Sequence, residues 1–545
     1  MAGWPGPSTR RSGRPRGRAG ARTTATLVRA LAAAASAAAL AAGCTALRHD
    51  VPRPPSYAID DPQQTELGRR FAAQLAPTPG MSGVRLLTSG QQAFLARAAL
   101  AEAAQRTLDL QYYVVAEDAT ATLLLYRALL AAQRGVRVRL LIDDLDVGDR
   151  DSHLASLAAH PNVQLRVFNP FAWRGAANLG KALDYLSDAA RLNRRMHNKL
   201  WIADNAVAVI GGRNLSDAYF SADTRSNFAD LDVLVAGPAV AEASRSFDEY
   251  WNSEWAVPIQ AFTGPTLDPG HAERLMSELA ERAAAFHGSD YVAELLASGF
   301  GPLVRAGQVE LIAAPAVVLH DPPAKRQDGA TEPQRPLLER LRQTVEAAQA
   351  ELMLISPYFV PPERGIDTLC ELRRRGVRVR VLTNSLASTD VAAVHAGYAR
   401  YRPRLLACGV ALYELQPAAP QSGRGRRLPA PRVSLHAKAV VVDRRSILIG
   451  SMNLDPRSRW TNTEVAVLID SAAIGGELGR WFDQAASLEH SFSLQLATPG
   501  DPDAALIWTG REGGALQRFD SEPGTSWWQR AAAHLLGALV PEEML

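Results

Sequence analysis

Cysteine is scarce in this chain, with three residues among 545. One of them, Cys44, lies near the N-terminus, and only Cys370 and Cys408 remain in the rest of the sequence. So few cysteines exclude the disulfide framework of a small secreted protein. We therefore expect Cys370 and Cys408 to be buried free thiols, with a single bridge between them as the alternative.

The chain also lacks a strong net charge. Its formal charge is +3, yet residues 1–43 hold seven arginines and no lysine or acidic residue. Taking these seven positive charges away leaves about −4 on the remaining residues. A general nucleic-acid binder needs a broad basic face to release the counterions of the phosphates. We therefore expect no nucleic-acid partner, although a local basic pocket is compatible with this composition.

The N-terminal segment has no hydrophobic run long enough to span a bilayer comfortably. Its Ala/Leu-rich stretch covers residues 30–42, whereas a spanning helix needs about 20 residues. Arginines before this stretch and Gly43-Cys44 after it are typical of an export signal. Residues 40–44 resemble a bacterial lipoprotein signal, which implies that residues 1–43 are a signal peptide and that Cys44 is lipidated and becomes the first mature residue. The alternative is an uncleaved anchor with an incidental cysteine. Both alternatives predict a membrane-associated protein of the bacterial cell envelope, and lipidation predicts the periplasmic side.

One module occurs twice in the remaining sequence. The tetrapeptide Glu-Ala-Ala-Gln precedes a strand-like segment at 102–105 and again at 346–349. Arg-Gly-Val-Arg-Val-Arg then recurs from position 134 and from position 375, and His-x-Lys recurs from position 197 and from position 436. The offsets of 244, 241 and 239 residues are nearly constant. Such constancy indicates a duplication with few net insertions.

Alternation of helix-like and strand-like segments predicts an α/β fold. With 47% hydrophobic residues, the chain can form two large cores. We predict two pseudo-symmetric lobes, each a mixed, mostly β-sheet flanked by helices, with one active site shared between them. The predicted segments are a linker at 44–83, a first lobe at 84–270, a connecting segment at 271–335, a second lobe at 336–500 and a C-terminal tail at 501–545.

The strongest functional signal is a motif present in both halves. His197, Lys199 and Asp204 are followed by Gly211-Gly-Arg-Asn214. The second copy has His436, Lys438 and Asp443, followed by Gly450-Ser-Met-Asn453. Both copies fit H-x-K-x4-D-x6-G-[GS]-x-N. One such string is weak evidence, because His and Lys are common on exposed strands, but two matched copies within a repeat are not expected by chance.

The residue types point to a phosphate site. On a strand, residues i and i+2 project from the same face, so each His and its Lys can reach one bound group. Lysine is a poor metal ligand and a good phosphate partner, so we expect no metal and no cofactor. We expect Asp204 and Asp443 to support turns, and Asn214 and Asn453 to donate amide hydrogen bonds to a phosphate oxygen.

These paired motifs resemble the phospholipase D superfamily, and the wider sequence resembles its bacterial cardiolipin synthase C type. The stretches that carry this likeness include Leu-Gln-Tyr-Tyr at 110–113, Phe-Asn-Pro-Phe at 168–171, Ser-Pro-Tyr-Phe-Val-Pro at 356–361 and Val-His-Ala-Gly-Tyr at 394–398. The resemblance implies that one histidine attacks phosphorus and the other serves as acid and base. His197 is our choice for the nucleophile and His436 for the acid/base, although the reverse order fits the sequence equally well.

An attacking imidazole needs an acceptor for its second ring nitrogen. By resemblance, Glu464 is one such carboxylate, and Asp230 or Asp232 is its counterpart in the first half, with Asp230 favoured by alignment of the strand that follows. Ordinary strand-end acids are the alternative reading of these residues. Lys199 and Lys438 would neutralise charge on the phosphoryl oxygens.

The expected substrates are phospholipids at a membrane, and the sequence predicts no particular protein partner. The resemblance implies transfer of a phosphatidyl group between phosphatidylglycerol and a second phospholipid, phosphatidylethanolamine, which makes cardiolipin. The alternatives are a hydrolytic phospholipase D that releases phosphatidic acid and a nuclease-type phosphodiesterase acting on DNA. Arginines in the polar loop at 418–432 and at 191, 194 and 195 could attract an anionic headgroup or could serve only packing and solvation.

Overall fold

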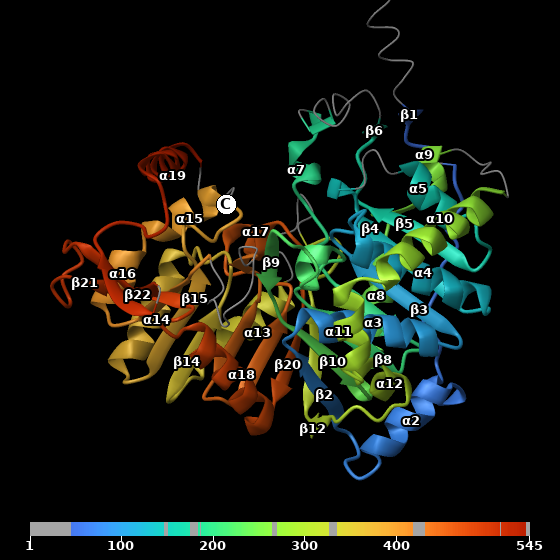
Figure 1. Cartoon of the computed structure of the whole chain (residues 1–545), viewed down its shortest axis with the longest axis horizontal. Helices are drawn as coiled ribbons and strands as arrows, with labels where there is room; N and C mark the ends of the chain where they lie inside the picture. The colour runs from blue at the N-terminus through green and yellow to red at the C-terminus, as the bar shows by residue number, and fades with distance from the viewer. Residues whose placement is uncertain are drawn as a thin grey trace, which may run out of the picture.

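The computed structural model describes residues 45–48, 50–146, 151–174, 184–185, 187–263, 270–325, 335–417, 431–512 and 514–540. The lipidation predicted at Cys44 lies outside these residues. Two large mixed sheets stand side by side, each with helices on its outer face (Figure 1). No described helix is both long enough and apolar enough to cross a membrane.

Among the described residues, the first sheet has nine strands, of which β3, β4 and β5 are parallel and all other neighbours antiparallel. In spatial order the strands are β11(Ala256–Pro258), β5(Val163–Phe168), β4(Arg137–Asp143), β3(Thr107–Tyr112), β7(Leu200–Ala203), β8(Val207–Gly211), β10(Asp232–Ala236), β2(Ser82–Leu87) and β12(Ile312–Ala314).

The second sheet has ten strands in the part of the chain that the structure describes, and it repeats this plan, with β14, β15 and β16 parallel. In spatial order its strands are β13(Ala316–His320), β20(Val465–Asp470), β19(Ser446–Gly450), β18(Ala439–Val442), β14(Glu351–Ile355), β15(Arg378–Asn384), β16(Ala411–Leu415), β21(Ser491–Leu496), β22(Leu506–Glu512) and β23(Ala515–Phe519). The order β5-β4-β3-β7-β8-β10 thus matches β16-β15-β14-β18-β19-β20 strand for strand, which confirms the predicted repeat and the two-lobed α/β fold.

Equivalent backbone turns mark the repeat. The helices α4(Ala119–Gln133) and α14(Glu363–Arg374) each end at a glycine, Gly135 and Gly376, with φ of 94° and 90°. Only glycine adopts such angles without strain. Each glycine then leads into a parallel strand, β4 or β15, as the sequence predicted.

The inner faces of the sheets share one core. β8 and β10 of the first sheet pack against β19 and β20 of the second. The helices α8(Pro238–Trp251) and α18(Ala472–Ala485) complete this shared core. The outer faces are covered by α3(Gly90–Ala103) and α4 on the first sheet and by α13(Pro336–Glu346) and α14 on the second. Two lobes with a common core form one rigid frame for any site at their boundary.

Further elements connect and extend the lobes. A two-stranded parallel sheet of β9(Ser226–Ala229) and β17(Arg432–Leu435) joins the halves, and β1(Thr45–Ala46) pairs with β6(Trp173–Arg174). The other helices are α2(Glu66–Leu75), α5(Asp151–Leu157), α7(Ala189–Leu192), α9(Gln260–Thr263), α10(Gly270–His287), α11(Asp290–Ala297), α12(Phe300–Arg305), α15(Ala392–Ala399), α16(Arg402–Ala407), α17(Pro456–Trp460) and α19(Trp527–Leu539), with 3-10 turns η1(Pro62–Gln64), η2(Asp144–Asp146) and η4(Asp217–Tyr219).

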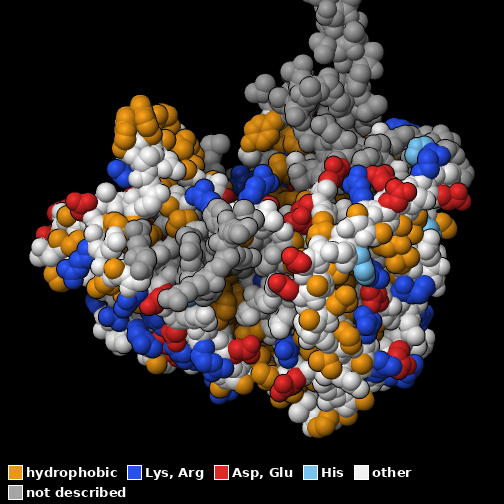
Figure 2. Space-filling view, viewed as in Figure 1, with side chains coloured by type: hydrophobic (Ala, Val, Ile, Leu, Met, Phe, Trp, Pro, Cys, Tyr) orange, Lys and Arg blue, Asp and Glu red, His pale blue; other side chains and the backbone are white. Residues whose placement is uncertain are grey.

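The segment predicted as a C-terminal tail carries β22, β23 and α19. The two strands extend the second sheet beyond β21, and α19 packs on α15. Figure 2 shows hydrophobic side chains gathered over α19, at the upper left of the molecule. The exact boundaries of the predicted segments stay predictions.

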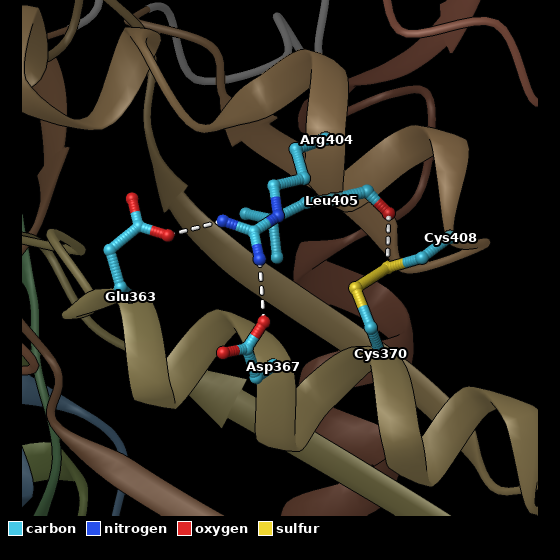
Figure 3. The surroundings of a disulfide bond; sticks show 6 residues. All are labelled: Glu363, Asp367, Cys370, Arg404, Leu405 and Cys408. Carbon is cyan, nitrogen blue, oxygen red and sulfur yellow. Dashed lines mark hydrogen bonds and ion pairs between the residues drawn. A yellow bond between two sulfur atoms is a disulfide. The ribbon is translucent and has the colours of Figure 1, made fainter.

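Cys370 and Cys408 form a disulfide, so the expectation of free thiols is wrong and the alternative holds. Cys370 lies on α14 and Cys408 directly follows α16, with their Cα atoms 5.4 Å apart (Figure 3). Arg404 of α16 also pairs with Glu363 and Asp367 of α14. Thirty-eight residues separate the two cysteines, and only the packing of the two helices brings them within bonding reach.

Candidate active site

Two equivalent hairpins place the duplicated motif. The histidine and lysine of each copy lie directly before β7 or β18. The first glycine of each copy ends the return strand, β8 or β19, and the asparagine follows it. At the opposite end of each hairpin the two turn residues have positive φ: 53° and 49° at Asp204 and Asn205, 51° and 48° at Asp443 and Arg444. Such angles at both central residues are typical of the tight turns that fit the twist of a hairpin.

The two motif aspartates lie at these turns. The Asp204 carboxylate accepts hydrogen bonds from the backbone N–H groups of residues 105–107 at 2.8–2.9 Å. Asp443 accepts the equivalent bonds from residues 349–351 at 2.7–3.0 Å. Each aspartate therefore fastens the hairpin to the neighbouring strand, at the far end of the hairpin from the histidine.

Each histidine is oriented by a carboxylate from the opposite half. His197 Nδ1 lies 2.9 Å from Glu464 Oε2, and His436 Nδ1 lies 2.6 Å from Asp230 Oδ2. An ionised carboxylate can only accept, so each Nδ1 is the donor and each Nε2 is left free. The structure thus brings together both predicted histidines and both predicted carboxylates; Asp232 instead pairs with Arg97.

The backbone repeats this exchange between halves. His197 N–H donates to Thr463 O at 2.9 Å, and His436 N–H donates to Ala229 O at 2.8 Å. Ala229 ends β9, the strand that pairs with β17 directly before His436. Both imidazoles are therefore fixed to the lobe that does not carry them.

The surroundings of the two carboxylates explain the one position at which the motif copies differ between glycine and serine. A Cβ added to Gly212 would come within 2.3 Å of Asp230 Oδ1, so no side chain fits there. The equivalent residue in the second copy, Ser451, donates its hydroxyl to Glu464 Oε2 at 2.5 Å. Ser458 donates a second hydroxyl, to Glu464 Oε1, at 2.7 Å.

The sequence predicted each lysine on one strand with its histidine, but the structure places both pairs in the segments directly before β7 and β18. Lys199 Nζ donates to the carbonyl oxygen of His197 at 2.6 Å, and Lys438 makes the same contact with His436. Both ammonium groups are buried. Each histidine experiences the charges of both lysines, because the four groups lie in one site.

Burial governs protonation in this site. It lowers the pKa of His197 to about 4 and holds that of His436 well below its ordinary value. It also lowers the pKa of Lys438 to about 8 and that of Lys199 well below its usual range. Neutral imidazoles with a free Nε2 suit nucleophilic attack. An anionic phosphodiester placed among these groups would raise the pKa of each of them, which allows one imidazole to carry a proton.

The two carboxylates differ in their protonation. Burial raises the pKa of Asp230. Burial also opposes ionisation of Glu464, yet its electrostatic interaction and hydrogen bond with His197, together with the charge of Lys199, outweigh this effect and lower the Glu464 pKa. The partner of His197 is therefore the more firmly ionised of the two.

The two asparagines have different surroundings. Asn214 Nδ2 donates to the Tyr219 hydroxyl at 3.0 Å, and its Oδ1 accepts from Val114 N–H at 3.2 Å. Asn453 Oδ1 is buried and has no hydrogen-bond partner within the described part of the chain. The role of both residues as phosphate donors stays a prediction.

Aromatic rings around the imidazoles were missed by the sequence reasoning. Tyr113 meets His197 edge-on at 5.0 Å between ring centroids, and Tyr219 meets His436 at the same distance. Phe228 lies 5.2 Å from His436. The only sequence signal was the position of Tyr113 at the end of the quoted stretch 110–113. These rings limit access of water to the two histidines.

The arginines near His197 serve packing. Arg191 pairs with Asp188 at 2.7 Å, and the buried Arg195 reaches Asp143 at 3.4 Å. In the polar loop, the arginines at 424, 426 and 427 lie outside the described residues, and Arg432 donates to Ala387 O. For Arg191 and Arg195, packing is therefore the reading that the contacts support.

A hollow of about 630 Å³ opens beside the site between α13, α14 and α17. Its walls are mainly apolar, and they include Leu338, Leu341, Phe359 and Leu369. Asn453 of the motif also lines it. A much smaller gap next to Lys438 shares Leu341, Met452 and Leu454 with it. The hollow therefore adjoins the duplicated motif and is large enough for part of a small organic molecule.

Known proteins resemble this chain over most of its length. A family model described as "Cardiolipin synthase, PLD-like domain" matches residues 98–251 and 341–486. Cardiolipin synthase C of Escherichia coli is 38% identical over 487 residues, 87% of this chain and 100% of that protein. Cardiolipin synthase A of Pseudomonas aeruginosa is 26% identical over 427 residues, 78% of this chain and 70% of that protein.

Among solved structures, a phosphatidylserine synthase of Haemophilus influenzae has a TM-score of 0.51 at 13% identity and covers 80% of this chain and 92% of that chain. This likeness bears on the fold alone. Each of the two segments matched by the family model contains one histidine-lysine pair, His197 with Lys199 or His436 with Lys438.

Proposed function

Because the chain belongs to the phospholipase D superfamily, cardiolipin synthase type, and is therefore a phosphatidyltransferase of that kind, we propose that it makes cardiolipin. The proposed substrates are phosphatidylglycerol and a second phospholipid, phosphatidylethanolamine. If phosphatidylethanolamine is the donor, transfer of its phosphatidyl group to the headgroup hydroxyl of phosphatidylglycerol gives cardiolipin and releases ethanolamine.

One observation carries this proposal: the exchanged pairs His197–Glu464 and His436–Asp230. Two neutral imidazoles, each with a carboxylate on Nδ1 and a free Nε2, provide the two groups that a double displacement at phosphorus requires. Two buried lysines beside them supply positive charge for the phosphoryl oxygens.

The proposed reaction has two steps. Binding of the anionic phosphodiester allows His436 to carry a proton on Nε2. In the first step, His197 Nε2 attacks phosphorus, the bond from phosphorus to the donor headgroup oxygen breaks, and His436 passes this proton to the leaving alcohol. In the second, His436 takes the proton of the acceptor hydroxyl, whose oxygen displaces His197 from phosphorus. The lower pKa of the Glu464 carboxylate favours His197 as nucleophile, because a firmly ionised partner stabilises the positive charge that develops on the attacking ring.

The apolar hollow beside Asn453 supports a lipid substrate. We propose that it receives part of an acyl chain while the phosphodiester lies at the histidines. Arg342 also lines the hollow but is paired with Glu339 and Glu346, so the support for a lipid comes from the apolar walls.

We propose that the protein is localised at a membrane of the bacterial cell envelope, where lipidated Cys44 anchors it on the periplasmic side. Phospholipid substrates and the predicted signal at 1–43 support this placement. A lipid-sized mass on the wild-type chain that is absent from a Cys44→Ser variant is the expected result.

The decisive test incubates the purified protein in detergent with labelled phosphatidylglycerol, with and without phosphatidylethanolamine, and resolves all products. We expect cardiolipin, with ethanolamine release when phosphatidylethanolamine is present. His197→Ala and His436→Ala should each lower the rate at least about a thousandfold. His490→Ala, which removes a histidine outside both motif copies that is hydrogen-bonded to Ser487, is the matched control.

The outcomes separate the candidate reactions. Phosphatidic acid as the sole product would replace the proposal with a hydrolytic phospholipase D. Full activity in either motif variant, at wild-type folding, would refute the shared site.

A further inference from the structure

The C-terminal helix α19 is held firmly on the second lobe. Ser526 and Gln529 form a capping box at its start. In the turn before it, Glu522 accepts from Arg402 at 2.6 Å and lies 3.2 Å from His395 Nε2. These contacts hold the start of α19 on the second lobe, in addition to the packing of the helix itself.

Four large apolar side chains of α19 face away from the second lobe. Its buried contact with α15 uses small residues: Ala533 is buried, and a Cβ on Gly537 would lie 3.3 Å from Ala396 Cβ. The large residues Trp527, Trp528, Leu535 and Leu539 are 58%, 67%, 60% and 69% exposed. An amphipathic helix that packs only on its own protein shows the opposite arrangement.

The outward residues form one continuous surface. Trp528, Leu535 and Leu539 are seven and four residues apart, which places them on one side of the helix. The Trp527 and Trp528 rings stack with centroids 3.6 Å apart. A contiguous apolar patch of this kind marks a surface that another phase or molecule covers.

The position of the exposed apolar face of α19 indicates what kind of partner covers it. α19 lies at the upper end of the molecule in Figure 1, and β1, which starts directly after Cys44, lies at the same end. α7 and α17 also lie toward this end, and α17 closely follows Asn453 of the duplicated motif. Figure 2 shows a smaller hydrophobic group over α7 and Lys or Arg side chains between the two groups.

We propose that this end of the molecule docks on a phospholipid bilayer, with the outward face of α19 in the boundary between headgroups and acyl chains. Tryptophan favours that boundary because its ring is apolar and its N–H is polar. Basic side chains beside the apolar patch complement anionic headgroups. Docking in this orientation turns the duplicated motif toward the lipid surface. The inference rests on the proposed function only for the kind of partner, because docking requires no turnover.

The test places a fluorophore on α19. The full-length chain with Cys44→Ser offers no free thiol, since Cys370 and Cys408 are bonded to each other. Leu535→Cys or Leu296→Cys then adds one labelling site. Leu296 is the matched control, because it is 70% exposed but lies on α11. Each labelled protein is mixed with vesicles of phosphatidylglycerol and phosphatidylethanolamine that carry a quencher on their acyl chains.

We expect vesicles to quench the label at 535 and to shift its emission to the blue, and to leave the label at 296 unchanged. Trp527→Ser with Trp528→Ser should weaken vesicle binding about tenfold or more, as binding scales with the apolar area that enters the lipid. Equal quenching at the two sites would overturn the proposal. The proposal would also be overturned if the label at 535 stayed unquenched and the protein formed a dimer that the two Trp substitutions dissociate. That result would assign the surface to a second copy of the chain.

The parallel activity assay uses a soluble short-chain lipid. The double Trp variant should keep wild-type turnover there and lose it on vesicles. A labelled chain that docks through position 535 and shows no turnover on either substrate would refute the proposed reaction and leave the docking surface intact.

Discussion

The Glu464→Gln variant tests whether a carboxylate of the second lobe sets the chemistry of a histidine in the first. Glu464 is buried and has no donor of its own when ionised, yet three groups donate to it: His197 Nδ1–H at 2.9 Å, Ser451 at 2.5 Å and Ser458 at 2.7 Å. An amide in its place would direct N–H groups at one or more of these donors. His197 would then lose its acceptor or change tautomer, which puts the hydrogen on Nε2.

The size of the effect follows from these contacts. A hydrogen bond to a charged group contributes about 1.5–3 kcal/mol. In the proposed reaction, the Glu464 charge also stabilises the positive charge that develops on His197 during attack. Losses of this kind reduce kcat by about 10²–10⁴-fold, which corresponds to about 3–5 kcal/mol of activation free energy. KM should change little, because the carboxylate does not face the substrate.

The assay follows cardiolipin formation in mixed micelles, with circular dichroism as the check on folding. Glu351→Gln is the matched control, because Glu351 is also buried and ion-paired, with Arg380 and Arg444, but at the opposite end of β14 from the histidines. A kcat for Glu464→Gln within about threefold of the wild type, in a folded protein, would refute the role assigned to this carboxylate.

Three further predictions concern the acid, the lysine and the disulfide. With a nitrophenyl phosphodiester lipid, whose leaving group needs no proton, His436→Ala should still release about one equivalent of nitrophenol and retain a phosphohistidine detectable by mass; failure of this burst would remove His436 from the acid role. Burial lowers the Lys438 pKa to about 8, so its ammonium loses its proton and kcat/KM should fall above about pH 8; a profile flat to about pH 10 would contradict this. Replacing Cys370 and Cys408 by serine opens a 38-residue loop and should lower the free energy of unfolding by about 3–4 kcal/mol, measured by denaturant titration; an unchanged midpoint would refute it.

Much of the fold could be predicted because both copies of the repeat contain short sequence patterns that determine helix ends and turns. Gly135 and Gly376 mark two helix ends that feed parallel strands, and both have the positive φ that the pattern requires. The Asp-Asn and Asp-Arg pairs at 204 and 443 mark hairpin turns for the same reason. Local backbone chemistry decides these features, so one sequence is enough to place them.

The site was predicted in its members but not in its connections. The sequence offers Glu464 and Asp230 as partners for the histidines, yet nothing local indicates that each serves the histidine of the other half. The same limit applies to Tyr219 and Phe228, which reach His436 only after the lobes join, and to the bridge between Cys370 and Cys408. Contacts between segments far apart in the chain depend on how the two sheets pack, which residue spacing does not encode.

Because each histidine is bonded to a carboxylate of the other half, the two copies of the repeat depend on each other. A separated half would carry one imidazole together with a carboxylate intended for the other, so neither half holds a complete catalytic apparatus. Two separately produced half-chains should be active only when they associate, because each histidine then meets the carboxylate of the other half. We therefore expect damage to either copy to abolish the activity of the whole chain.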